Sequence, residues 1–284
     1  MSDFAFMLCA DDYALAPGVS IGILEALSAG RLTATSVMTN RPLWRSAAAD
    51  LARFAPHAQI GLHLNLTLGA PCTSMPEFAP HGRLPALSRV IRATQRRALP
   101  QHEIRAEIAG QLDAFADAMG RPPDYVDGHQ HVHVLPGVRT WLLDELAARA
   151  LAGRIWLRDS SDRPSRIVAR RSETLKALAL AWFGHGFARL AQSRGFICND
   201  GFAGFSRFDP RADYGADFAR YLVAPGPRHL VMCHPGHVDP DLAAIDPVTT
   251  TRERELEFLL SSRFEATLQA AGARLGRWTG LTNS

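Results

Sequence analysis

The sequence has little of what marks proteins that bind nucleic acid or span membranes. Lys176 is the only lysine among 31 basic residues, and the arginines are scattered, so no basic run forms a stripe for nucleic acid. The net charge of this 284-residue chain is only +3. No window reaches the roughly 18 consecutive apolar residues that a membrane-spanning helix needs. We therefore expect neither nucleic acid as a partner nor stable insertion into a membrane.

Cysteines and targeting signals are also scarce. The four cysteines, Cys9, Cys72, Cys198 and Cys233, lie far apart and include no CxxC pair. Cys9 and Cys233 occur in apolar, strand-like runs and are typical of reduced core thiols. The N-terminus has no basic segment or small-residue cleavage site, and its apolar run ends at Asp11. These absences predict a cytoplasmic protein.

What the sequence does contain is an alternation of short apolar runs with helical patterns, in a chain that is 47% hydrophobic. It carries no GxGxxG or Walker motif, no repeat and no low-complexity linker. The predicted strands are Phe4–Ala10, Leu32–Met38, Gln59–Leu68, Tyr125–Asp127, Arg154–Arg158, Gly195–Cys198, His229–His234 and Ala273–Trp278. The predicted helices are Val19–Ala29, His102–Met119, Val138–Ala150, Glu173–Ser193 and Arg252–Ala271. This pattern predicts an α/β fold, a distorted (β/α) TIM-like barrel, with residues 1–284 forming a single domain.

Two segments look like insertions into this barrel. Residues 71–98 are rich in proline and turn residues, and we expect a long loop at the active-site end. Residues 170–196 form an apolar helical stretch that is interrupted near Gly184 and Gly186. This stretch fits an outer-layer helix, a lid, a contact in a homo-oligomer or a surface for a lipid-like substrate.

Two adjacent aspartates, Asp11 and Asp12, follow the first apolar run in the sequence ADDY. Carboxylates at the end of a buried strand cost desolvation free energy unless another group pairs with them. A helix cap or a turn explains such aspartates in many proteins. The alternative is a catalytic base that lies beside a metal ligand.

Polar side chains also alternate along the run GLHLNLTLG, in which His63 and Asn65 share one face of the predicted strand. The four leucines of the run share the opposite face and are expected to pack under helices. The polar face would point into the barrel, where polar groups need partners.

The run DGHQHVH places Asp127, His129, His131 and His133 on one face if the strand stays regular. Alternate residues on a strand face lie roughly 6.5–7 Å apart, which is too far for neighbouring histidines to share one ion easily. We therefore expect one of these histidines to bind a metal, while the others orient it, contact substrate or carry protons. Imidazole and carboxylate ligands suit Zn²⁺ or another first-row divalent ion.

His234 ends another apolar run, in HLVMCHPGHVDP. A histidine at the carboxyl end of a barrel strand lies where barrel enzymes place catalytic groups. Asp11, Asp12, His63 and His129 also lie at or just after the ends of predicted strands. Since these ends converge in a parallel barrel, the sequence predicts one shared site.

The motifs ADDYALAPG, GLHLNLTLG, DYVDGHQHVHVLP, WLRDSS and VMCHPGHVD occur in this order along the chain. In this respect the sequence resembles the YdjC-like carbohydrate deacetylase family, which includes chitooligosaccharide and hopanoid-associated deacetylases. The resemblance implies a divalent metal ion, Zn²⁺ or Mg²⁺, with Asp12, His63 and His129 as its ligands. The sequence differs from the common family pattern directly after the two aspartates, where Tyr13, Ala14 and Leu15 stand in place of a Phe-Gly pair.

The resemblance also implies roles for further residues. Asp11 would be the general base and His234 the general acid, and Arg158 would lie near the substrate or the base. We expect Asn65, His131 and His133 to contact substrate, and Asp127 to hold a histidine ring in the required tautomer.

The predicted function is metal-dependent hydrolysis of an N-acetyl group on an amino sugar. A metal-dependent phosphoesterase would use similar ligands, but the motifs supply only Arg158 as a cation for phosphate. A non-catalytic barrel that binds carbohydrate or lipid is the other alternative.

Overall fold

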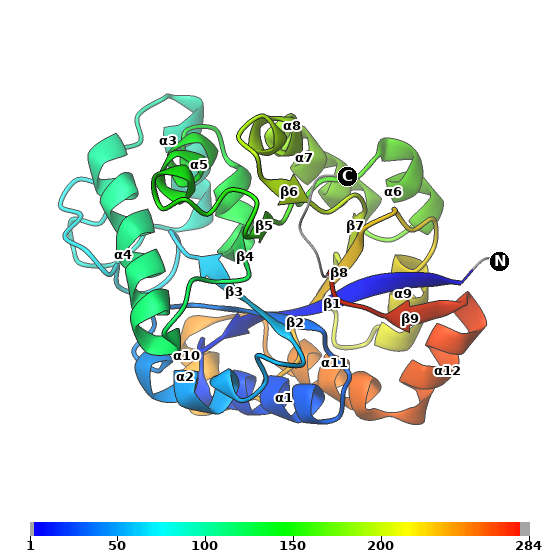
Figure 1. Ribbon diagram of the computed structural model, residues 1–284. Coiled ribbons are helices and arrows are strands. Elements are labelled where there is room, and N and C mark those ends of the chain that lie inside the picture. Colours follow the sequence, from blue (N-terminus) through cyan, green and yellow to red (C-terminus); the bar gives the residue numbers. More distant parts are fainter. Residues whose placement is uncertain (1–2, 279–284) are drawn as a thin grey trace.

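Parallel strands curl into an open barrel in this computed structural model, which describes residues 3–278 (Figure 1). The strand order is β6-β5-β4-β3-β2-β1-β8-β7, and β9 pairs with the beginning of β1. Within residues 3–278, no strand pairing joins β6 to β7, so the barrel is not closed by hydrogen bonds there. The strands are β1 (Phe4–Tyr13), β2 (Ala34–Val37), β3 (Gln59–Leu64), β4 (Tyr125–Gly128), β5 (Trp156–Leu157), β6 (Ile197–Cys198), β7 (Phe202–Ala203), β8 (His229–Cys233) and β9 (Ala273–Leu275).

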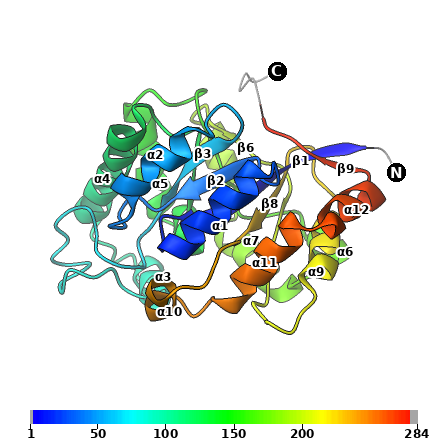
Figure 2. The same ribbon diagram turned by 90° about the horizontal axis from the view of Figure 1, so that it is seen from below.

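Helices cover the outside of this sheet, and α1 and α11 lie side by side across it (Figures 1 and 2). None of the helices in the described part of the chain is long and apolar enough to cross a membrane. The helices are α1 (Pro17–Ser28), α2 (Trp44–Ala52), α3 (Leu87–Gln95), α4 (Gln101–Met119), α5 (Val138–Ala148), α6 (Pro164–Arg170), α7 (Thr174–Phe183), α8 (Phe187–Gln192), α9 (Tyr214–Tyr221), α10 (Pro240–Ile245), α11 (Thr250–Leu260) and α12 (Ser262–Ala271), with a 3₁₀ segment η1 (His129–Val134).

The predicted fold class, an α/β barrel with distortions, is confirmed by this sheet and its helices. Several boundaries differ from the predictions. The helix expected over 173–193 is divided into α7 and α8, and the one expected over 252–271 is divided into α11 and α12. The segment 71–98 is a loop that also contains α3. The two ends of the predicted domain, residues 1–2 and 279–284, lie outside the described residues.

Alternate side chains of each strand point into the barrel, as the two-residue period of a strand requires. In β1, Met7 and Cys9 belong to the inner apolar cluster, whereas Phe6, Leu8 and Ala10 pack under the helices. Asp11 continues the inward-facing series. The same alternation leaves His63, Asp127, Arg158 and His234 as inward-facing residues at the ends of β3, β4, β5 and β8.

A bulge in β1 explains how two consecutive aspartates reach the same site. In a regular strand Asp12 would point away from Asp11. The pairing of β1 with β2 shifts register between Ala10 and Tyr13, and Asp12 has a φ of 72°, in the left-handed region. Bulges of this kind redirect a side chain, and a non-glycine residue at positive φ stores local strain. Here the bulge turns Asp12 into the barrel.

The strand predicted over Tyr125–Asp127 is present as β4, but the shared strand face predicted for His129, His131 and His133 is wrong, because β4 ends at Gly128. The chain continues as η1, in which Gln130 and His131 have φ values of 51° and 60°. The three histidines of DGHQHVH therefore do not share one strand face. The strand predicted through Leu68 is also shorter, since β3 ends at Leu64.

Candidate active site

A cavity of about 350 Å³ lies at the carboxyl ends of the strands. Its wall includes Asp11, Asp12, His63, His129 and His234, which come from the ends of three strands, β1, β3 and β8, and from the start of η1. Hence the residues that the sequence separates by up to 223 positions line one cavity. His131 also lines this cavity.

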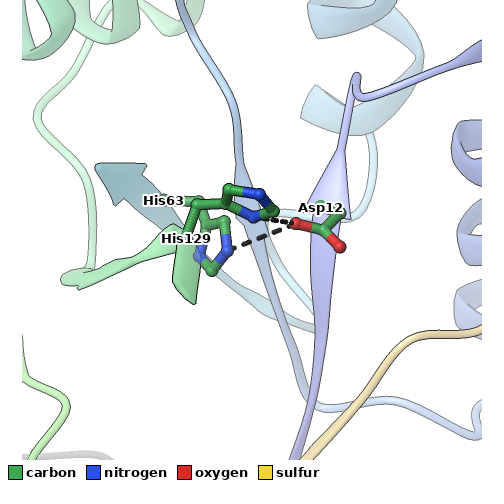
Figure 3. Close-up of side chains that lie close together, drawn as sticks. All are labelled: Asp12, His63 and His129. Atoms are coloured by element: carbon green, nitrogen blue, oxygen red, sulfur yellow. Dashed lines mark hydrogen bonds and ion pairs between the residues drawn. The ribbon is translucent and has the colours of Figure 1, made fainter. Parts of the chain in front are cut away.

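Asp12, His63 and His129 form a tight cluster in which their ring nitrogens and carboxylate oxygens face one another (Figure 3). Asp12 Oδ1 lies 2.9 Å from His129 Nδ1 and 3.3 Å from His63 Nε2. Ligand atoms at about 2.1 Å from one ion would be separated by about 3.0–3.4 Å in octahedral or tetrahedral geometry. The spacing and the mixed nitrogen and oxygen donors of the cluster therefore fit a divalent metal ion.

Asp127 fixes the orientation of the His63 ring. Its Oδ1 lies 2.6 Å from His63 Nδ1, and the two residues are paired in the register of β3 and β4. Ser36 Oγ lies 3.1 Å from the same nitrogen. Burial alone would lower the pKa of His63, but Asp127 and Asp11 outweigh it and raise this pKa to about 10. Because the Asp127 carboxylate binds His63 Nδ1, the other ring nitrogen, Nε2, points at Asp12. This arrangement is common for metal-binding histidines.

Asp11 is held by a bidentate ion pair with Arg158. The Nη1 and Nη2 atoms of Arg158 donate to the two carboxylate oxygens of Asp11 at 2.7 and 2.6 Å. Arg158 is fully buried and also pairs with Asp127. Burial would raise the pKa of Asp11, but the Arg158 guanidinium outweighs it and holds this pKa well below its usual range. Asp11 is therefore ionised at neutral pH.

His234 faces Asp11 from the end of β8, with 4.0 Å between its Nε2 and Asp11 Oδ2. Its ring meets the ring of Phe208 edge-on, with 5.4 Å between the centroids. Burial lowers the pKa of His234 to about 4, although Asp11 and Asp12 act in the opposite direction. The ring is therefore neutral at pH 7 before any ligand binds.

Two residues that the sequence analysis did not single out complete the site from α11. Arg252 Nη2 donates to Asp12 Oδ2 and to Asp246 Oδ2, both at 2.7 Å. Glu255, one turn further along α11, accepts a hydrogen bond of 2.6 Å from the backbone N–H of His234. The spacing of three residues puts both side chains on the buried face of α11. The sequence RERE indicates a role for Arg252 and Glu255 in the site only if the position of α11 over the barrel is already known.

Asn65, His133 and Arg158 do not form part of the cavity wall. Asn65 binds the backbone of the turn after β3, since its Oδ1 accepts from the N–H groups of Thr67 and Leu68 at 3.0 Å each. His133 is fully buried, and its Nε2 lies 2.8 Å from the carbonyl oxygen of Arg158. In this structure the three side chains contact protein groups around the site. They are buried outside the cavity wall, so a substrate in the cavity would not contact them directly.

The chain is similar to proteins with known names. A sequence model of the family described as YdjC-like protein matches residues 5–270. A protein named chitooligosaccharide deacetylase from Citrobacter koseri is 32% identical over 271 residues, which cover 94% of this chain and 95% of that protein. One of the same name from Escherichia fergusonii is 29% identical over 281 residues, with coverages of 95% and 96%. A solved structure from Enterococcus faecalis V583, described as a candidate cellobiose-phosphate cleavage protein, aligns with a TM-score of 0.72, 25% sequence identity and 97% coverage of both chains.

Proposed function

The chain belongs to the YdjC-like protein family, and on that premise we propose that it is a metal-dependent hydrolase that removes an N-acetyl group from an acetylated amino sugar. The names of its relatives from Citrobacter koseri and Escherichia fergusonii support carbohydrate deacetylation. The observation that carries the proposal is the convergence of Asp12, His63 and His129 beside Asp11 in one cavity.

We propose Asp12, His63 and His129 as the ligands of one divalent ion, Zn²⁺ or Mg²⁺. Such an ion polarises the acetyl carbonyl and lowers the pKa of water toward about 7. Arg252 binds the carboxylate oxygen of Asp12 that faces away from the histidines, so the other oxygen stays directed at the cluster.

Asp11 acts in this proposal as the general base. It is ionised because Arg158 pairs with it, and it lines the cavity beside the cluster. A general base must lie within hydrogen-bond reach of the proton that it removes, and the position of Asp11 permits this for a water that attacks the acetyl carbon. The Arg158 pair also prevents the carboxylate from rotating away, because both of its oxygens are bound.

His234 acts as the general acid for the departing amine. Because the ring is neutral at pH 7, it first has to receive a proton before it can give one. Asp11 Oδ2 lies 4.0 Å from Nε2 of the ring, so Asp11 would pass on the proton taken from water. The Glu255 hydrogen bond fixes the backbone of His234 at the end of β8.

Acetate release from N-acetylglucosamine oligomers tests this proposal. The metal-stripped protein should be inactive, and activity should return when Zn²⁺, Mg²⁺ or Mn²⁺ is added. Asp11→Asn should lose at least about 100-fold in turnover, as expected for a lost general base, while its metal content stays at the wild-type level. Asp241→Asn, at an exposed position of α10, is the matched control.

The result also separates the proposal from its alternatives. Phosphate release from sugar phosphates without acetate release would favour a phosphoesterase. Full activity in Asp11→Asn would show that the base is another residue.

A further inference from the structure

A second cavity of about 660 Å³ is lined by three segments of the chain that also reach the candidate active site. The end of α3 contributes Thr94 and Gln95 to its wall, and the loop after η1 contributes Pro136. The last residues of α7, Trp182 and Phe183, form another part of the wall.

The same three segments also line the active-site cavity. The first residue of α3, Leu87, lies there, as do residues 129–131 of η1 and Lys176 of α7. Residues separated by seven positions share one helical face, so Leu87 and Thr94 lie on one face of α3, and Lys176 and Phe183 on one face of α7. At a rise of 1.5 Å per residue, the two members of each pair are about 10 Å apart along their helix. Both helices thus extend from the first cavity to the second.

The lining of the second cavity combines an aromatic surface with polar donors. Trp182 is 72% exposed, whereas the other four tryptophans are buried or half-buried. Its ring meets the ring of Phe183 with 4.9 Å between the centroids. Arg139 lines the same cavity. The hydroxyl of Thr94 is buried and has no hydrogen-bond partner within the described part of the chain.

This combination suits a sugar ring. The C–H face of a pyranose packs on an aromatic ring, while its hydroxyl groups hydrogen-bond to side-chain donors and acceptors at the edges. Trp182 and Thr94 belong to the wall of one cavity, so a ligand inside it would cover the exposed indole near a buried hydroxyl that has no partner in the described part of the chain.

We propose that the second cavity is a subsite for a distal ring of the same oligosaccharide whose N-acetyl group reaches the Asp12 cluster. This inference rests on the proposed function. The substrate therefore spans both cavities and contains more than one sugar ring, and Trp182 packs against a ring that is not deacetylated.

Binding to the metal-free protein tests this inference without catalysis. N-acetylglucosamine and its tetramer are titrated into wild type, Trp182→Ala, Trp182→Phe and Leu175→Ala while heat and tryptophan fluorescence are recorded. Leu175 is the matched control, because it is 84% exposed on α7 and lines neither cavity. The tetramer should bind wild type more tightly than the monomer and change the fluorescence of Trp182. An aromatic contact of about 0.5–1.5 kcal/mol corresponds to a loss of roughly 3- to 10-fold in tetramer affinity for Trp182→Ala. Trp182→Phe should retain most of the affinity, and Leu175→Ala all of it.

Equal affinities of the tetramer for Trp182→Ala and Leu175→Ala would overturn the subsite, as would equal affinities of monomer and tetramer for wild type. Acetate assays with the metal-loaded protein separate this failure from that of the proposed function. If wild type releases acetate from the tetramer and Trp182→Ala does so with the same KM, only the subsite is wrong. If no oligomer yields acetate although the tetramer binds at Trp182, only the deacetylase proposal is wrong.

Discussion

Replacement of Arg158 by methionine would remove the bidentate partner of Asp11 and one of the two partners of Asp127, which also pairs with His63. Arg158 is fully buried and pairs with both Asp11 and Asp127, which are 2% and 0% exposed. Removal of one partner from a buried ion pair typically costs about 3–5 kcal/mol, because the remaining charge stays buried. We expect Arg158→Met to lose about that much free energy of unfolding at pH 8.

The size of this loss should depend on pH. In wild type the pKa of Asp11 is lowered by Arg158, so its contribution to stability is present above its unfolded pKa and is lost as the pH falls through the folded value. Without Arg158, burial alone would raise the pKa of Asp11, and the ionised form would be penalised. The variant can relieve this penalty by protonation at low pH, so its deficit should be smaller at pH 5 than at pH 8.

Urea unfolding of wild type and Arg158→Met in the presence of a chelator, at pH 5, 6.5 and 8, measures this deficit in the free energy of unfolding. Arg163→Met is the control, because its side chain is 68% exposed and its nearest carboxylate oxygen, on Asp200, is 3.7 Å away. That change should cost less than about 0.5 kcal/mol. The double variant Arg158→Met with Asp127→Asn should regain part of the loss. A deficit below about 1 kcal/mol at pH 8, or one that does not change with pH, would refute the ion-pair argument.

Three further changes have defined expected outcomes. Burial raises the pKa of Glu255 to about 7 from an ordinary value of 4.5, so between these pH values the folded protein holds a proton that the unfolded chain releases. As the pH rises from 4.5 to 8, the free energy of unfolding should therefore fall by about 3 kcal/mol less in Glu255→Gln than in wild type. Parallel pH curves of the two proteins in urea unfolding would contradict this. In Gly61→Ala the new Cβ would clash with the ring of Tyr125, so the free energy of unfolding should fall by about 1–3 kcal/mol. An unchanged unfolding midpoint would argue against this packing. Arg252 donates hydrogen bonds to the Asp246 carboxylate and to the carbonyl of Val248. Arg252→Gln should therefore speed hydrogen exchange at the backbone amides of Asp246 and Val248, and unchanged exchange there would show that other contacts hold this wall of the cavity.

The inward-facing positions of the strands could be predicted from the sequence, because the two-residue period and the ends of the apolar runs fix them. His63, Asp127 and His234 were placed in this way, at the strand ends that meet in the barrel. Asp11 follows the same rule from Met7 and Cys9.

Other features depend on contacts that no local pattern contains. The bulge that turns Asp12 inward depends on how β1 pairs with β2, and alternation alone places this side chain outside. The turn at Gly128 breaks the histidine pattern, because the backbone takes left-handed values at Gln130 and His131. The packing of α11 brings Arg252 to Asp12 across 240 positions in the sequence. Helical period shows which face of α11 is buried but not which strand end that face meets.

Anomalous X-ray scattering from crystals grown with Mn²⁺ or Zn²⁺ tests the metal site most directly. We predict one strong peak at about 2.0–2.3 Å from Asp12 Oδ1, His63 Nε2 and His129 Nδ1, and its loss in His63→Ala. A peak at another group of residues, or the same peak in His63→Ala, would contradict the proposed centre.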